Sequence, residues 1–108
     1  MSWMFYDATS FDGSVSWGTS NLKDTSFMFT RAISFSGKGI EDWDVSKVWN
    51  LFGMFNGASA FRRDLCAWGP TLPDGAHGEY AFTESGCDIT TTPDLEANPP
   101  GPFCFICV

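Results

Sequence analysis

The chain contains the stretch Met28-Phe29-Thr30-Arg31-Ala32-Ile33-Ser34-Phe35, and this pattern decides how the chain is organised. The same Met-Phe-x-x-Ala-x-x-Phe spacing runs from Met4 to Phe11 and from Met54 to Phe61. A tryptophan follows each copy, at Trp17, Trp43 and Trp68. Self-similarity that recurs about every 25 residues is typical of solenoid proteins, in which each repeat packs on the next.

Spacings within the repeats separate constant blocks from a variable one. Met and the second Phe are 7 residues apart in all three copies, and Trp17 and Trp43 are each 11 residues from the next Met. Only the stretch from Phe to Trp varies, over 6, 8 and 7 residues. Because loops tolerate insertions and packed elements do not, each repeat is predicted to contain two packed elements and a surface loop.

Each repeat is expected to hold a short helix and then a short extended piece. Val48, Leu51, Phe52 and Phe55 lie at i, i+3, i+4 and i+7, which would line one face of a helix with Ser46 as its N-cap. The extended pieces are expected to be parallel strands that carry Val15 and Trp17, Ile40 and Trp43, and Leu65 and Trp68. The periodic tryptophans are interpreted as stacked interior, not as a platform for a sugar.

The chain divides into repeats over residues 1–68 and a cap over residues 69–108, within one domain. All 6 prolines lie in the second part, and proline resists both helix and sheet, so loops are expected there. Ala81-Phe82 is interpreted as a decayed fourth Met-Phe. The stretch from Pro99 to Val108 is stiff and apolar, and is expected to cover the end of the repeats.

Composition argues against some classes of partner. The chain has 108 residues, a formal net charge of -7, and 11 Phe, 5 Trp and 2 Tyr. Nucleic-acid binding needs clustered Lys and Arg, but only 6 such residues stand against 13 Asp and Glu, so no nucleic-acid partner is expected. No apolar run reaches the ~20 residues of a membrane-spanning helix, and Met1-Ser2-Trp3 is not recognised as a secretory signal.

The N-terminal repeat has no counterpart of the C-terminal cap. A coil that starts at Met4 would leave one face of Trp3, Phe5, Phe11 and Trp17 uncovered. Trp49, like Trp3, lies outside the repeating Trp position, so both are candidates for a surface contact. Because a partner gains ~25 cal/mol for each Å2 of apolar area it covers, Trp3, Phe5, Phe11 and Trp49 are the predicted interface residues.

The repeats resemble a known family. Met-Phe-x-x-Ala-x-x-Phe, then a short aliphatic stretch and Trp43-Asp44-Val45-Ser46-Lys47-Val48, is similar to the BspA-like surface-protein repeat, also classified as the domain of unknown function DUF285. The resemblance covers residues 4–68 well and departs at Gly18-Thr19-Ser20-Asn21-Leu22. It implies a leucine-rich-repeat-like solenoid on secreted or surface proteins, used for adhesion and recognition, without catalytic residues.

The expected fold is therefore an α/β repeat. It would be a short right-handed leucine-rich-repeat-like solenoid of about 2.5–3 coils, each with a short helix and a short parallel strand. An irregular, disulfide-stapled C-terminal cap would complete it.

Four cysteines, Cys66, Cys87, Cys104 and Cys107, lie in or beside the proline-rich part. In a small chain they predict two disulfides and an oxidising compartment, outside the cell or at its surface. The pairing Cys66–Cys87 with Cys104–Cys107 is favoured because it would tie the last repeat to the cap; the alternative joins Cys87 to a tail cysteine. A zinc site would need all four to converge, and a redox Cys-x-x-Cys would need a following helix.

The sequence marks no catalytic residues, metal site or cofactor motif. His77, the only histidine, lies in a loop without a marked nucleophile or orienting partner. Glu41, Asp42 and Asp44 flank Trp43, but they lack the spacing of a calcium loop and are interpreted as a solvated acidic edge.

Two functions follow as hypotheses. The first is a non-enzymatic structural or adhesion module, outside the cell or on its surface, that docks or self-assembles through its uncapped N-terminal coil. The second is a recognition module that binds a glycan, a protein or Ca2+ along one face of the solenoid. Concentration-dependent assembly would support the first, and a higher melting temperature with Ca2+ would support the second.

Overall fold

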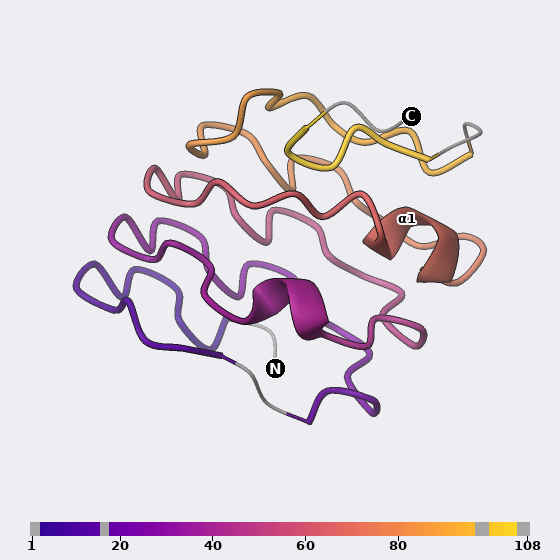
Figure 1. Cartoon of the computed structure of the whole chain (residues 1–108), viewed down its shortest axis with the longest axis horizontal. Helices are drawn as coiled ribbons and strands as arrows, with labels where there is room; N and C mark the ends of the chain where they lie inside the picture. Colours follow the sequence, from indigo (N-terminus) through magenta and orange to yellow (C-terminus); the bar gives the residue numbers. More distant parts are fainter. Residues whose placement is uncertain (1–2, 16–17, 97–99, 106–108) are drawn as a thin grey trace.

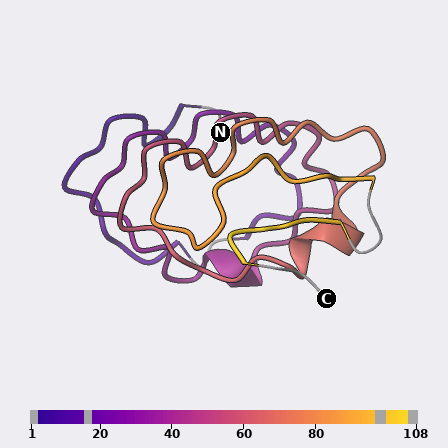
Figure 2. The same cartoon turned by 90° about the horizontal axis from the view of Figure 1, so that it is seen from above.

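The computed structural model describes residues 3–15, 18–96 and 100–105. The chain winds in coils that lie one above the next, so that positions about 25 residues apart in sequence come side by side (Figure 1). Seen from above, the coils follow one another with similar outlines (Figure 2). The molecule measures 36 × 29 × 19 Å along its principal axes.

Each coil contains a run of overlapping β-turns, called here a turn segment. The four turn segments cover residues 3–11, 25–35, 51–61 and 78–85. Within a segment, alternate backbone N–H groups donate to the carbonyl three residues earlier: Met28 donates to Thr25 at 3.1 Å, and Ala32 donates to Phe29 at 3.0 Å. These bonds close one turn after another and fold each Met-Phe-x-x-Ala-x-x-Phe stretch back and forth.

The remaining N–H groups join neighbouring turn segments. Phe29 donates to the Met54 carbonyl at 2.9 Å, and the equivalent Phe55 donates to Ala81 at 2.8 Å. The residues two before and two after each of these phenylalanines make the corresponding bonds, at 2.7–3.0 Å, and segments 1 and 2 are joined in the same way. From Phe27 to Ala32 the backbone donors thus alternate between bonds within the coil and bonds to the next coil, without a helix or a sheet.

The predicted α/β repeat, a leucine-rich-repeat-like solenoid of short helices and short parallel strands, is wrong. In the described residues the helices are the 3-10 helix η1 (Ile40–Asp42) and α1 (Trp68–Thr71). No sheet forms among these residues, only isolated bridges such as the parallel pairs Asp24 with Asn50 and Asn50 with His77. η1 lies where an extended piece was predicted, α1 begins at Trp68 and continues into the part predicted as loop, and turns replace the predicted helices.

Left-handed backbone at two positions of each turn segment explains why no helix forms there. The φ angle is 56° at Phe27 and 61° at Arg31, and it is also positive at the equivalent Gly53 (63°) and Gly57 (77°). An α-helix needs consecutive right-handed residues, so a reversal every four residues prevents it. Such a conformation costs a non-glycine residue about 1–2 kcal/mol, and the hydrogen bonds between segments hold it in place.

Two columns of phenylalanine rings form the core. The first Phe of each repeat and Phe82 stack with centroid spacings of 5.4, 5.6 and 5.7 Å, and successive planes are within 9° of parallel. The second Phe of each repeat forms the other column, with spacings of 5.6 and 6.1 Å. Within each coil the two rings also stack on each other, at 3.9–4.2 Å. The constant spacing of the repeat therefore aligns both columns.

The described tryptophans of the repeat belong to the interior, as predicted. Trp43 is 5% exposed and Trp68 is 3% exposed, whereas Trp17 lies outside the described residues. Trp43 Nε1 donates to the Val15 carbonyl at 2.6 Å, which ties one coil to the next. Trp68 Nε1 is buried and has no hydrogen-bond partner among the described residues.

The stack continues into the part that was predicted as a cap. Residues 78–85 form the fourth turn segment, at the site of the decayed repeat predicted from Ala81-Phe82. The tail, defined as residues 86–96 and 100–105, follows this segment at the same end of the stack, where Leu65 N–H donates to the Phe103 carbonyl at 3.3 Å (Figure 1). The Phe103 ring lies 6.2 Å from Phe82 and nearly perpendicular to it, at 86°, so the parallel column ends there.

Candidate binding surface

A row of aromatic rings runs across the outside of the turn segments. Trp3 stacks on Phe27 with centroids 4.4 Å apart, Phe27 contacts Phe52 at 5.4 Å, and Phe52 contacts Tyr80 at 5.5 Å. Tyr6 packs against Trp3 at 4.9 Å. These five residues are called the aromatic row. They come from all four turn segments, so the hydrogen bonds that stack the coils also align the rings.

The left-handed positions of the backbone carry most of the row. Trp3, Phe27 and Tyr80 each precede the Met of their segment or its equivalent, and their φ angles are 65°, 56° and 61°. Gly53 holds this position in the third segment, and a Cβ there would lie 3.0 Å from the Phe27 ring. The preceding residue, Phe52, supplies the ring instead, so the row is not interrupted.

The aromatic row is largely open to solvent. Trp3, Tyr6 and Tyr80 are 52%, 38% and 54% exposed, and Phe27 and Phe52 are half-buried. Since a large aromatic side chain offers 150–250 Å2, the row leaves roughly 400 Å2 of apolar surface uncovered. This is a usual size for the largest apolar patch of a single-chain protein, and such patches are often functional.

The predicted interface residues fall into two groups. Trp3 and Trp49 are exposed, and Trp3 begins the aromatic row. The Trp49 ring makes an edge contact with His77, at 6.4 Å. Phe5 and Phe11 are half-buried because they stack within the ends of the core columns, so they are not part of the row.

Four members of the row, Tyr6, Phe27, Phe52 and Tyr80, are not predicted by the repeat pattern. A weak signal does exist in the sequence, because an aromatic residue precedes Met4, Met28 and Ala81. The repeat pattern does not show that this position faces solvent, because that depends on its left-handed backbone.

Ion pairs join equivalent regions of neighbouring coils. Arg31 Nε lies 3.0 Å from Asp7, and Lys38 Nζ lies 3.8 Å from Asp12. Ser36 donates its backbone N–H and its hydroxyl to Asp12, at 2.9 and 2.7 Å. These two bonds, the backbone bond foremost, hold the pKa of the Asp12 carboxyl below its ordinary value. All these groups are on the surface, where they support the register of the coils.

The residues considered for catalysis or metal binding do not converge. His77 is exposed, and its Nδ1 lies 3.8 Å from Glu79. Glu41, from the acidic edge, lies 3.7 Å from Arg63. The part of the chain that the structure describes contains no group of three or more His, Cys, Asp or Glu residues that could hold a metal ion.

Asp44 has a structural contact in place of the predicted helix cap. Its carboxylate accepts the Ser46 backbone N–H at 3.0 Å, so a turn forms where Ser46 was predicted to cap a helix. Hydrogen bonds from the Ser46 hydroxyl and backbone hold the pKa of Asp44 below its ordinary value. The Asp44 backbone N–H donates to the Thr19 hydroxyl at 2.9 Å, which again links two coils.

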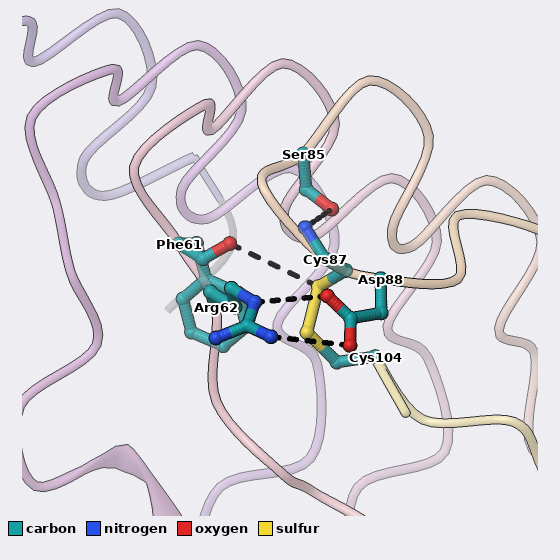
Figure 3. Close-up of polar contacts among 6 residues, drawn as sticks. All are labelled: Phe61, Arg62, Ser85, Cys87, Asp88 and Cys104. Atoms are coloured by element: carbon teal, nitrogen blue, oxygen red, sulfur yellow. Dashed lines mark hydrogen bonds and ion pairs between the residues drawn. A yellow bond between two sulfur atoms is a disulfide. The ribbon is translucent and has the colours of Figure 1, made fainter. Parts of the chain in front are cut away.

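Covalent and ionic contacts hold the tail on the stack (Figure 3). Cys87 and Cys104 form a disulfide. Beside it, Arg62 donates through Nε and Nη2 to the two carboxylate oxygens of Asp88, at 2.9 and 3.1 Å, and these bonds raise the pKa of Arg62. The Arg62 guanidinium also lies 5.0 Å from the centre of the Phe105 ring. Arg62, in the third coil, thus contacts the tail near its start, at Asp88, and near its end, at Phe105.

The favoured disulfide pairing is wrong. Cys87 bonds to Cys104, which is the alternative in which Cys87 joins a tail cysteine. The path of the tail explains this pairing, because it brings the two Cα atoms within 4.7 Å. Cys66 is also disulfide-bonded, and Cys107 lies outside the described residues. The bridge is compatible with an oxidising compartment.

A cavity of about 420 Å3 lies beside α1 and the tail. Its described lining consists of proline, leucine, glycine and alanine with the carboxylates of Asp74 and Glu96. This lining holds no Ser, Thr, Cys, His or Lys that could act with a carboxylate in catalysis, so the aromatic row is the stronger candidate site. No helix in the described ranges is long and apolar enough to cross a bilayer.

Comparison with known proteins agrees with the repeat pattern. Residues 1–78 match the model of the family described as "Mycoplasma protein of unknown function, DUF285". This region includes the first three turn segments. No curated protein and no solved structure matches the chain. Because the match spans well over half of the chain, the protein belongs to the DUF285 family.

Proposed function

We propose that this chain is a non-enzymatic, extracellular adhesion module that docks a protein partner through its aromatic row. The observation that carries the proposal is the continuous contact of the row across all four turn segments, from Trp3 to Tyr80. Exposed, adjacent Trp, Tyr and Phe side chains are the residue types that dominate binding energy in protein interfaces. Adhesion is also what the resemblance to BspA-like repeats implies.

The size of the row supports a contact of useful strength. Covering roughly 400 Å2 of apolar surface at ~25 cal/mol per Å2 contributes on the order of 10 kcal/mol before the costs of association. The backbone beneath the rings is fixed by the hydrogen bonds between segments, so little ordering is needed when a partner binds.

The arrangement of the rings favours a protein over a glycan. Trp3 and Phe27 lie face to face, with planes 25° apart, and Phe52 meets Tyr80 edge to face, at 72°. Sugars pack on free aromatic faces, but much of the ring face within the row is already covered by the next ring. The outward edges fit the apolar and aromatic side chains of a protein.

The disulfide supports an extracellular setting, because such bridges persist in oxidising compartments. The aromatic row extends the N-terminal docking site expected from the sequence. Trp3 lies in the first coil, and Tyr80 lies in the last turn segment, so the docking surface follows the whole stack and is not confined to one end.

The proposal is tested by measuring binding of the immobilised chain to a panel of purified extracellular proteins and to a glycan array. A Phe27→Gly/Tyr80→Gly variant removes two rings, and glycine suits the left-handed backbone at both positions. We expect saturable protein binding that falls about tenfold or more in this variant.

Ile33→Ala is the matched control, because Ile33 is a 48% exposed apolar residue that is not a member of the row. It should bind as the unaltered chain does. Unchanged protein binding by the Phe27→Gly/Tyr80→Gly variant would contradict the proposal. Ring-dependent binding to glycans alone would favour the recognition of sugars instead.

A further inference from the structure

The formal charge of the chain is divided unevenly along the stack. Residues 1–63 contain all 6 Lys and Arg and 6 of the 13 Asp and Glu, so their formal charges cancel. Residues 64–108 contain the remaining 7 Asp and Glu without any Lys or Arg, so they carry the whole net charge of -7. This part includes the fourth turn segment and the tail, which lie at one end of the stack (Figure 1). A local excess of one sign attracts partners of the opposite sign.

Glu79 places part of this negative charge at the aromatic row. It directly precedes Tyr80, which is the member of the row in segment 4. Gly53 N–H donates to the Glu79 carbonyl at 3.0 Å, so Glu79 holds in segment 4 the position that Phe52 holds in segment 3. Since Phe52 contacts Tyr80 at 5.5 Å, the Glu79 side chain begins beside this ring contact, one coil further along the stack.

Glu84 adds a second carboxylate in the same segment. It holds the second left-handed position of segment 4, four residues after Tyr80, with a φ angle of 59°. The equivalent residues of segments 1 and 2, Asp7 and Arg31, neutralise each other in an ion pair at 3.0 Å. Segment 3 has the uncharged Gly57 at this position. This column of positions is therefore neutral over the first three segments and acidic at the fourth.

The two carboxylates have no internal counter-ion. Glu79 and Glu84 are exposed, and no Lys or Arg in the described ranges forms an ion pair with either of them. The contact of Glu79 is with His77, at 3.8 Å, and His77 is neutral in the formal charge at pH 7. Tyr80 is 54% exposed, so an incoming cation can reach its ring as well as the carboxylates.

Elsewhere the chain itself holds a cation with a carboxylate and a ring. The Arg62 guanidinium donates to both carboxylate oxygens of Asp88, at 2.9 and 3.1 Å, and lies 5.0 Å from the centre of the Phe105 ring. A guanidinium is stabilised in this way because its N–H groups match a carboxylate and its charge is attracted to the face of a ring. Segment 4 presents the same two kinds of group to the outside.

We propose that the partner of the aromatic row is a protein segment whose Arg or Lys side chains lie at Tyr80 and whose apolar side chains lie on Phe27 and Phe52. The inference rests on the proposed docking through the row, and it adds the charge of the partner and the direction in which it lies. A side-chain cation fits better than a metal ion, because the described residues include no group of three or more His, Cys, Asp or Glu that could hold a metal. The carboxylates of residues 64–108 repel an acidic partner.

The probe is a dye-labelled synthetic peptide with leucine and tryptophan in one half and arginine in the other. A second peptide has glutamate in place of each arginine. Fluorescence anisotropy measures binding of both to the disulfide-bonded chain at about 0.1 and 1 M NaCl, between which the Debye length falls from about 10 to about 3 Å. We expect the arginine peptide to bind about tenfold more tightly at the lower salt, and the difference to shrink at the higher salt.

Two charge variants locate the effect. Glu79→Gln/Glu84→Gln removes both carboxylates but keeps the size of the side chains, so it should weaken binding of the arginine peptide about three- to tenfold at the lower salt. Asp64→Asn/Glu96→Gln is the matched control, because it removes the same charge from two exposed residues of the acidic part that lie outside the turn segments. It should bind the arginine peptide within about twofold of the unaltered chain.

The direction of the partner is tested with a nitroxide spin label at the arginine end of the peptide. The label should broaden the NMR amide signals of Tyr80 and Phe82 more than those of Phe27 and Phe29. Stronger broadening at Phe27 and Phe29 would contradict the proposed direction.

Equal binding of the two peptides at the lower salt would overturn the inference, and so would a lack of measurable binding of the arginine peptide. Equal weakening by both charge variants would assign the effect to net charge alone and would overturn it too. The Phe27→Gly/Tyr80→Gly variant tests the proposed function separately, on the panel of extracellular proteins. If it weakens that binding but Glu79→Gln/Glu84→Gln does not, docking through the row stands and the basic partner does not. If it changes nothing, the proposed function itself fails.

Discussion

Gly37 offers a direct test of how one coil packs on the next. Its φ angle is 93°, and a Cβ added there would lie 2.6 Å from Cε2 of Phe61 and 2.8 Å from Cγ of Arg63, both in the next coil. The Phe61 ring is fully buried, so it cannot move aside easily. Gly75 has a similar φ, 79°, but a Cβ there would meet no atom within 4 Å.

The two glycines therefore separate backbone strain from steric conflict. Gly75→Ala should cost about 1–2 kcal/mol of unfolding free energy, which is the cost of a left-handed alanine. Gly37→Ala adds the cost of overpacking, typically about 1–3 kcal/mol, and should total about 2–5 kcal/mol. Urea unfolding followed by tryptophan fluorescence measures both. With slopes of about 1–3 kcal/mol per molar urea, the two midpoints should differ by about 1 M.

Equal losses of stability in the Gly37 and Gly75 variants would refute the reasoning. That result would mean that Phe61 and Arg63 do not lie against Gly37, and hence that neighbouring coils are not packed as described. A gain of stability at Gly37 would refute it as well.

Further predictions concern hydrogen bonds of the stack. Trp43→Phe loses the bond to the Val15 carbonyl, whereas Trp68→Phe loses none. In urea unfolding, Trp43→Phe should therefore lower the free energy of unfolding by about 1–2 kcal/mol more than Trp68→Phe does. Equal losses would contradict the bond. The lowered pKa of Asp12 adds stability that is present above the ordinary carboxyl range and lost as pH falls through the folded-state pKa. Asp12→Asn should therefore flatten the fall in urea midpoint between neutral and acidic pH; an unchanged pH profile would mean that the Ser36 bonds do not form.

The repeat predicts the core but not the local conformation. Met28, Phe29, Ala32 and Phe35 are all fully buried, because the constant spacing of the pattern reflects the constant position of these side chains in each coil. The predicted helix at 48–55 fails for a physical reason. Overlapping turns with i to i−3 bonds bring apolar residues to one side every three or four positions, which imitates the spacing of a helix.

The left-handed positions are the main obstacle to prediction. Gly53 and Gly57 mark them in the third repeat, but Phe27 and Arg31 hold the same positions in the second, and aromatic or charged residues rarely adopt positive φ. The aromatic row depends on these positions and on Phe52, which substitutes for a missing side chain. The tail and its disulfide pairing depend on contacts between distant segments, which spacing alone does not fix.

The most direct measurement is NMR detection of scalar couplings through the hydrogen bonds between coils. The stack predicts couplings from the amide nitrogen of Phe29 to the carbonyl carbon of Met54, and from Phe55 to Ala81. A coupling from Phe52 to Val48, four residues earlier, is what a helix would give instead. Finding that local coupling without the two long-range ones would contradict the stacked coils and the aromatic row that they align.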